Sequence, residues 1–142
     1  MNGQEAALPE ETLQRLDTLE KRVLAASQMH WADRITLPEG YDPNPLIEEL
    51  HTIYCEACKR SDTREALFLR ARIIVLRGLV PPFCHASERA FAEAKWIFHD
   101  LRRITGDLIY EENARWCVNL ARGYDYNEAI AAFKRNGVLN ND

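Results

Sequence analysis

Residues 62–78, DTREALFLRARIIVLRG, decide the fold class because this stretch is apolar on nearly every side of a helix. A helix with apolar residues all round is normally buried among other helices. We therefore predict a central helix that has Asp62 as its cap, runs to Arg77 and stops at Gly78. The apolar residues of this helix are Ala66, Leu67, Leu69, Ile73, Ile74, Val75 and Leu76.

Five further segments carry apolar residues at the helical spacing of three and four. Each is bounded by residues that start or stop helices, such as proline, aspartate and glycine. No segment alternates in the manner of a half-buried strand. The expected segments are 9–32, 44–60, 87–105, 107–122 and 125–136, with Asn44, Ser87, Asp107 and Asp125 as caps.

The sequence thus predicts an all-α fold of about six helices, either a compact helical bundle or a short stack of helical hairpins. Its 142 residues suit a single helical domain over residues 1–142. A loop at residues 33–44 contains Pro38, Gly40 and Pro43 and is followed at once by Pro45, and it separates the first helix from the rest.

Charge and composition exclude several classes of protein. The net charge is −4, and arginine outnumbers lysine fourteen to four. Residues 1–50 carry ten acidic and four basic side chains, whereas residues 51–142 carry twelve and fourteen. The basic part is mild and its charges alternate with acids, so we do not expect binding to nucleic acid.

We expect a soluble, cytoplasmic protein without a membrane association. No window of the sequence approaches the 18 apolar residues that a membrane span needs. The first residues, MNGQE, have neither the basic nor the apolar region of a secretory signal. The four cysteines are therefore expected as reduced thiols.

Trp96 is the candidate centre of a binding surface. It lies off the apolar face of its helix, and its helical neighbours are Arg89, Glu93, Asp100 and Arg103. An aromatic side chain surrounded by arginines and acids is typical of a protein-binding anchor with a polar rim. The alternative is that another helix of the same domain covers Trp96.

Arg70 and Arg77 share one face of the central helix. Arginine is suited to bidentate contacts in partly desolvated places, so these residues either bind a partner or pair with internal acids. A further alternative is that Arg64, Arg70, Arg72 and Arg77 together bind nucleic acid. Arg72 points away from Arg70, however, so the four residues do not form one stripe.

A cysteine–histidine set offers the main alternative chemistry. His51, Cys55 and Cys58 follow one another at i, i+4 and i+7, so they share a helical face. With Cys84, or with its neighbour His85, they could complete a tetrahedral zinc site. Cysteine pairs in structural zinc sites normally lie in turns, and free cysteines often serve as small buried apolar residues. Cys84 or Cys55 with a histidine base is the corresponding nucleophile hypothesis.

The sequence contains no nucleophile elbow, phosphate-binding glycine loop, zinc-protease motif or dinucleotide fingerprint. The neighbouring glutamate pairs occur in or near first helical turns, where acids offset the helix dipole. We therefore expect a protein that is not an enzyme and that needs no cofactor, apart from the zinc alternative.

Residues 112–135 resemble the second helix of a tetratricopeptide repeat, with Tyr126, Ala129 and Phe133 in matching places. The match departs from the family at an extra residue after Gly123 and at residues 136–137. The pair Arg77-Gly78 is repeated as Arg122-Gly123 forty-five residues later, within the period of helical repeats. The resemblance implies stacked helical pairs that bind proteins.

Together these features predict a module that binds another protein or protein complex, as an adaptor, a regulator or an inhibitor. Small mobile-element inhibitors, including immunity and anti-CRISPR types, share this size and lack of motifs, which is an analogy alone. The sequence leaves the oligomeric state and the identity of the partner open.

Overall fold

The structure is a computed structural model that describes residues 8–33, 35–60 and 62–141. The two ends of the expected domain and residue 34 of the expected loop lie outside these residues. The described chain is all α-helical, as predicted, and it has six helices. They are α1 (Glu10–Asp33), α2 (Pro43–Cys58), α3 (Arg64–Leu79), α4 (His85–Thr105), α5 (Ile109–Ala121) and α6 (Tyr126–Arg135).

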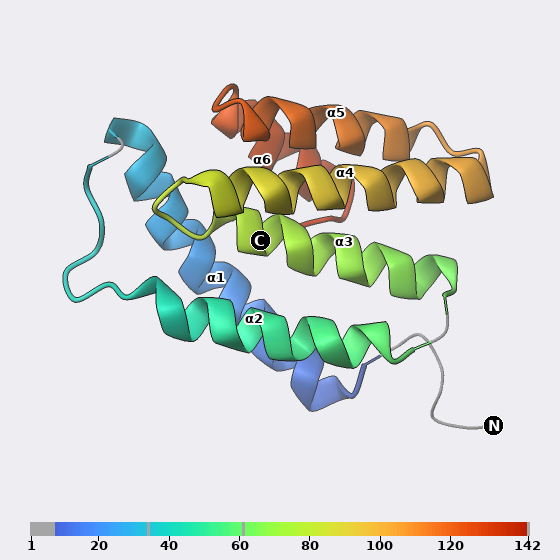
Figure 1. Cartoon of the computed structure of the whole chain (residues 1–142), viewed down its shortest axis with the longest axis horizontal. Coiled ribbons are helices and arrows are strands. Elements are labelled where there is room, and N and C mark those ends of the chain that lie inside the picture. Colours follow the sequence, from blue (N-terminus) through green and yellow to red (C-terminus); the bar gives the residue numbers. More distant parts are fainter. Residues whose placement is uncertain (1–7, 34, 61, 142) are drawn as a thin grey trace.

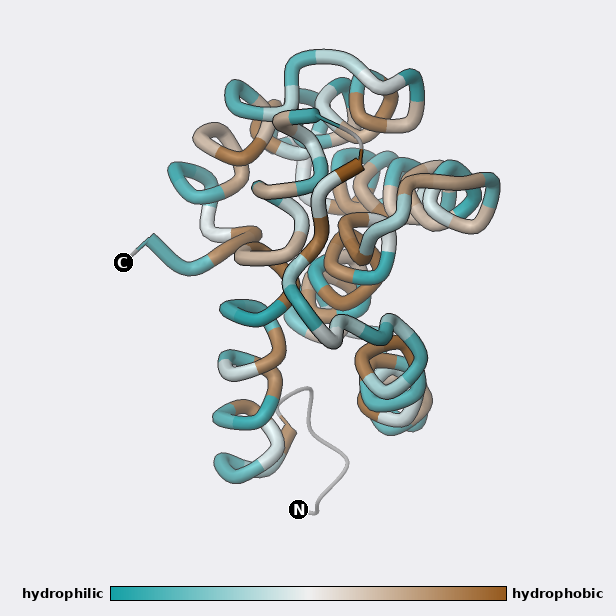
Figure 2. Tube along the Cα trace, turned by 90° about the vertical axis from the view of Figure 1, so that its left-hand side faces the viewer, coloured by the Kyte–Doolittle hydropathy of each residue, from teal (hydrophilic) through white to brown (hydrophobic). Residues whose placement is uncertain are grey.

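The helices form two layers (Figure 1). Helices α2, α3, α4 and α5 run side by side, each antiparallel to the next, and the α3–α4 and α4–α5 pairs make the most extensive contacts. Helices α1 and α6 lie behind this layer, with α1 against α2 and α3 and α6 against α5. The side view shows apolar segments of both layers facing the space between them (Figure 2).

The apolar stretch that we singled out is the central helix, α3. It packs against α2 on one side, α4 on the other and α1 behind. The whole run from Ile73 to Leu76 is buried. The prediction of a central helix is therefore confirmed, and its physical basis is the absence of a polar face along this run.

Gly78 does not end α3, contrary to our expectation. The helix continues through it to Leu79, and Gly78 has no left-handed backbone. A Cβ atom at this position would lie 2.7 Å from Cε1 of the buried Phe91 ring of α4. Glycine therefore serves here to let α4 approach α3 closely. Gly123 of the second Arg-Gly pair differs from Gly78, because it has φ 82° and follows the end of α5.

Four helices have caps at other residues than expected. Helix α2 starts two residues early, because the side chain of Asp42 accepts from the N–H of Asn44 and Pro43 has no N–H that would need an acceptor. Thr63, and not Asp62, caps α3 by accepting from the N–H of Ala66. Helix α5 has Leu108, and not Asp107, as its cap residue, although the Asp107 side chain accepts from the N–H of Ile109 at 3.1 Å. The cap of α4 is Cys84 and not Ser87.

Helix α4 begins at His85, so Ser87 lies in its first turn. The Ser87 hydroxyl accepts a hydrogen bond from the backbone N–H of Cys84 at 3.2 Å. The stop of this helix is confirmed, since Gly106 has φ 75°, a left-handed conformation that glycine adopts without steric cost. The predicted ends of α5 and α6 agree with the structure within one or two residues.

The chain after α6 is held against α1. Val138 and Leu139 are buried. The backbone N–H of Asn140 donates to Glu20 at 2.7 Å, and its side-chain amide donates to Asp17 at 3.0 Å. Asn140 is therefore part of the fold and not of a free tail.

Candidate functional site

Trp96 lies on the outer face of α4 with 62% of its surface exposed. Helix α4 is flanked by α3 and α5, and neither of them covers this side chain. The Nζ atom of Lys95 lies 4.6 Å from the centre of the indole ring, within range of a cation–π contact. The His99 ring lies 5.5 Å away on the following turn. Trp96 is therefore exposed, and the alternative, that another helix of the domain covers it, is not what the structure shows.

Charged side chains extend from Trp96 in both directions along α4. Arg89 is exposed two turns before it. Arg103 is exposed two turns after it and donates to Asp100 at 2.8 Å. This pair is solvent-exposed, so it contributes little to folding stability and stays available to another molecule.

Helix α2 is joined to this face by a hydrogen bond. The Tyr54 hydroxyl donates to the carboxylate of Glu93, one turn before Trp96, at 2.9 Å. Because α3 lies between α2 and α4, this bond connects two helices that flank α3. Burial, and then the bond to Glu93, raise the pKa of the Tyr54 phenol, so it stays a donor at neutral pH.

We call this surface the α2–α4 face. It consists of one stripe from each of three consecutive helices, and the sequence spacing within each stripe is helical. Its residues are Ile47, His51 and Tyr54 of α2, Ile74 and Arg77 of α3, and Arg89, Glu93, Trp96, Asp100 and Arg103 of α4.

The two arginines of α3 have different surroundings. Arg70 binds inside the fold: it pairs with Asp62 at 2.8 Å and donates to the backbone oxygens of Ala57 and Arg60 at the end of α2. Of the two roles expected for Arg70, binding a partner or pairing with an internal acid, the structure shows the second. Arg77 is half-buried at the edge of the α2–α4 face.

The other arginines of α3 are also paired with acids. Arg72 binds Asp17 at 2.9 Å and Glu20 at 3.0 Å, behind the helix layer. Arg64 lies 3.7 Å from Glu65. The structure thus distributes these residues over different sides of α3 and neutralises three of the four, which disfavours a nucleic-acid surface on this helix.

The expected zinc ligands are not brought together. The Nε2 atom of His51 lies 3.5 Å from Sγ of Cys55. Cys58 is the last residue of α2 and Cys84 precedes α4, and these helix ends lie at opposite ends of the molecule (Figure 1). Among residues 8–33, 35–60 and 62–141, no group of three or more histidine, cysteine or acidic side chains could hold a metal ion. His51, Cys55 and Cys58 all belong to α2, as predicted. Cys84, the expected fourth ligand, lies at the other end of the molecule because of the way the helices are connected.

The sequence neighbours Cys84 and His85 do not form a nucleophile and base. The His85 ring points to Glu88, with 3.2 Å between Nδ1 and Oε1. Burial alone would raise the pKa of the Cys84 thiol, but hydrogen bonds from the backbone of Ser87 and Ala86 outweigh it and lower the pKa. Cys117 is fully buried and its pKa is raised, which is typical of a cysteine that serves as a small apolar residue.

Tyr54 and its bond to Glu93 were missed by sequence reasoning. Tyr54 follows Ile47 and His51 at helical spacing, so its place beside them on α2 could have been inferred. Its hydrogen-bond partner lies 39 residues later on a helix that does not adjoin α2, and periodicity holds no information on such a contact.

Comparison with protein-family models, curated proteins and solved structures finds no match to this chain. Within the residues that the structure describes, no helix is both long enough and apolar enough to cross a membrane.

Proposed function

We propose that this protein is a non-enzymatic binding module that regulates or inhibits a partner protein through the α2–α4 face. The observation that carries the proposal is Trp96, a large aromatic side chain that is 62% exposed between charged residues. Aromatic residues of this kind supply much of the binding energy at protein interfaces, because the partner removes a large apolar area from water.

The rim of the surface supports the same function. Arg89 and the Arg103–Asp100 pair offer charges of both signs on either side of Trp96. Charges at the edge of an interface mainly set the orientation and the rate of association. The tetratricopeptide-like character of residues 112–135, which implies protein binding, agrees with this proposal.

Affinity capture with a matched pair of variants tests the proposal. Wild type, Trp96→Ala and Tyr124→Ala are immobilised and exposed to the same cell extract, and retained proteins are identified by mass spectrometry. Tyr124 is the control because it is exposed to a similar extent, 59%, but lies in the turn between α5 and α6. We expect a partner that wild type and Tyr124→Ala retain and Trp96→Ala loses, with affinity reduced by about thirtyfold or more.

A stability measurement makes the result interpretable. Because Trp96 is exposed, its replacement should change the free energy of unfolding by less than about 0.5 kcal/mol. Equal retention of every protein by wild type and Trp96→Ala would overturn the proposed site. A large loss of stability in Trp96→Ala would instead assign the indole to the packing of α4.

A second candidate function, a cysteine-dependent activity, rests on the 3.5 Å contact between His51 and Cys55. A histidine at this distance can accept the thiol proton and raise thiolate reactivity. The alkylation rate of Cys55 by iodoacetamide tests this, with the exposed Cys58 as internal reference. A His51→Gln variant with an unchanged rate at Cys55 would exclude the dyad.

A further inference from the structure

The α2–α4 face contains a small apolar pocket between α2 and α3, with a volume of about 170 Å³. Its walls are Ile47, His51 and Tyr54 of α2 and Ile73, Ile74 and Arg77 of α3. Sites for whole small-molecule ligands usually measure roughly 300–1,000 Å³. This pocket is therefore of a size for a single side chain.

Arg77 gives the pocket a positive charge at its edge. Arg64, Arg70 and Arg72 of the same helix each lie within 4.0 Å of a carboxylate. No ion pair of Arg77 occurs among the described residues. A half-buried guanidinium beside an apolar wall is complementary to a carboxylate that accompanies an apolar group.

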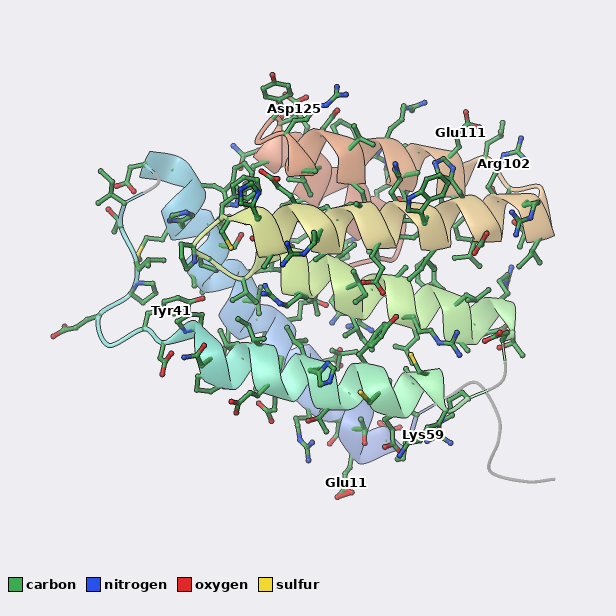
Figure 3. All side chains as sticks on the ribbon, viewed as in Figure 1. Glu11, Tyr41, Lys59, Arg102, Glu111 and Asp125 are labelled. Atoms are coloured by element: carbon green, nitrogen blue, oxygen red, sulfur yellow. The ribbon has the colours of Figure 1, made fainter. Side chains whose placement is uncertain are left out.

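Arg77 affects the pKa of the Tyr41 phenol and of the Cys84 thiol, and neither of these groups is a carboxylate. Tyr41 lies in the loop before α2 (Figure 3) and donates to the backbone oxygen of Pro81 at 2.7 Å. Burial is the main cause that raises the pKa of Tyr41 to about 12, so at neutral pH it offers Arg77 no negative charge. Among the described residues, Arg77 thus has no carboxylate within ion-pair distance, and it is available to a carboxylate of another molecule.

We propose that the pocket receives one apolar side chain of a partner polypeptide, and that Arg77 binds the carboxylate of an adjacent acidic residue in the same segment. This inference rests on the proposed function, because the occupant belongs to the partner. The pocket is continuous with the Trp96 surface: Tyr54 forms part of its wall and donates to Glu93, one turn from Trp96.

Capped tetrapeptides test the proposal. In each, serines flank leucine followed by aspartate, asparagine or lysine, and the peptides are titrated into the full chain. Binding is followed by methyl NMR of Ile47, Ile73 and Ile74. We expect the aspartate peptide to shift these methyl signals with an affinity about tenfold higher than the asparagine peptide, and the lysine peptide to bind least.

Two arginine variants separate the pocket from general charge attraction. Arg77→Met keeps the aliphatic stem and should abolish the preference for aspartate over asparagine. Arg115→Met removes an exposed arginine of α5 and should leave the preference intact. Equal affinities of the aspartate and asparagine peptides for wild type would overturn the proposal, as would a preference that persists in Arg77→Met.

Isocaproate, which joins a leucine-like chain to a carboxylate, distinguishes a polypeptide from a free acid. Tighter binding of isocaproate than of the aspartate peptide would assign the pocket to small acids and overturn the proposed occupant. The two proposals fail separately. A Trp96-dependent partner without any peptide preference overturns this inference alone, whereas a peptide preference with Trp96-independent capture overturns only the role of Trp96.

Discussion

Gly78 sets the distance between α3 and α4, the pair with the most extensive contacts. The Phe91 ring occupies the space where a side chain at position 78 would begin, and this ring is fully buried. A buried ring cannot move aside without disturbing its own neighbours, because protein interiors are close-packed. A single missing Cβ atom therefore determines the geometry of the layer that carries the α2–α4 face.

We expect Gly78→Ala to destabilise the protein. Alanine gains about 1 kcal/mol of helix propensity over glycine, but overpacking a core costs about 1–3 kcal/mol. The overlap with Phe91 at 2.7 Å places this site at the upper part of that range, so the net loss should be about 1–2 kcal/mol. Urea unfolding measures it. The double variant Gly78→Ala, Phe91→Leu should recover part of the loss, and a stabilised single variant would contradict the packing role.

Tyr126 joins α6 to α1 through its hydroxyl and its ring. It accepts a hydrogen bond from the buried Ser27 hydroxyl at 3.0 Å and stacks on Trp31 with 5.0 Å between ring centres. Tyr126→Phe should lower the free energy of unfolding by about 1–2 kcal/mol, because it leaves the Ser27 hydroxyl buried without this partner. Tyr124→Phe is the control and should have no effect, since Tyr124 is exposed.

The pair of Ser27 and Tyr126 also allows a double-variant test. Removing both polar groups, as Ser27→Ala with Tyr126→Phe, should cost less than the single Tyr126→Phe change. Additive losses in thermal or urea unfolding would show that the two hydroxyls act independently, against the hydrogen bond described here.

At the scale of the helices, the connection between layers depends on a charged cluster behind α3. The Glu20 side chain is only 3% exposed, and it binds Arg72 of α3 and the backbone of Asn140. Asp17 binds the same two residues from one turn earlier on α1. The two acids of α1 thereby connect α3 with the segment after α6.

Arg72→Met should cost about 2–3 kcal/mol of unfolding free energy, because it leaves the buried Glu20 carboxylate without its cation. Arg64→Met is the matched control on the same helix. Its pair with Glu65 is more than half exposed on both sides, so the change should stay within about 0.5 kcal/mol. Equal losses in the two variants, measured by urea unfolding, would refute the role of the cluster.

An ion pair also connects α4 and α5. Arg102 near the end of α4 and Glu111 in the first turn of α5 lie 3.6 Å apart across the short turn between the helices (Figure 3). Both side chains are more than a third exposed, so the pair contributes little to stability. It aligns α4 with α5 beyond the Trp96 surface.

For the whole molecule, the acids with depressed pKa values determine the response to acid. Hydrogen bonds from the Thr36 side chain, and then from the backbone of Thr36 and Ile35, lower the pKa of Asp33 to about 2. Burial tends to raise the pKa of Asp17, but bonds from Asn140 and Arg72 outweigh it and lower the pKa. The bond from Trp116 is the main cause that lowers the pKa of Glu112.

Folding stability should therefore decrease as the pH falls from about 4.5 to about 2. Each of these groups has a lower pKa in the folded than in the unfolded chain, so its contribution is present above the unfolded value and is lost as the folded group takes up its proton. Urea unfolding at a series of pH values measures the slope. Asp33→Ala should flatten the part between about 4 and 2, and an unchanged slope in this variant would exclude Asp33 as a contributor.

The sequence by itself determined the helical elements of this protein. The central position of α3, the stop at Gly106 and the left-handed Gly123 after α5 follow from side chains within one or two turns. Helix ends are set by local hydrogen bonds and periodicity, which act over a few residues. For this reason the class of fold and most helix boundaries could be predicted, while the caps of α2, α3, α4 and α5 lie one to three residues from the expected positions.

The tertiary structure alone decided which residues meet. Arg70 binds groups inside the fold, whereas Trp96 lies at the surface. Cys84 and Cys58 lie at opposite ends of the molecule. The pocket beside Arg77 likewise depends on how α2 packs against α3, and the bond from Tyr54 to Glu93 joins α2 to α4, two helices later in the chain. Such contacts depend on which helix faces pack together, and a helix of given periodicity can bury its apolar face against several neighbours.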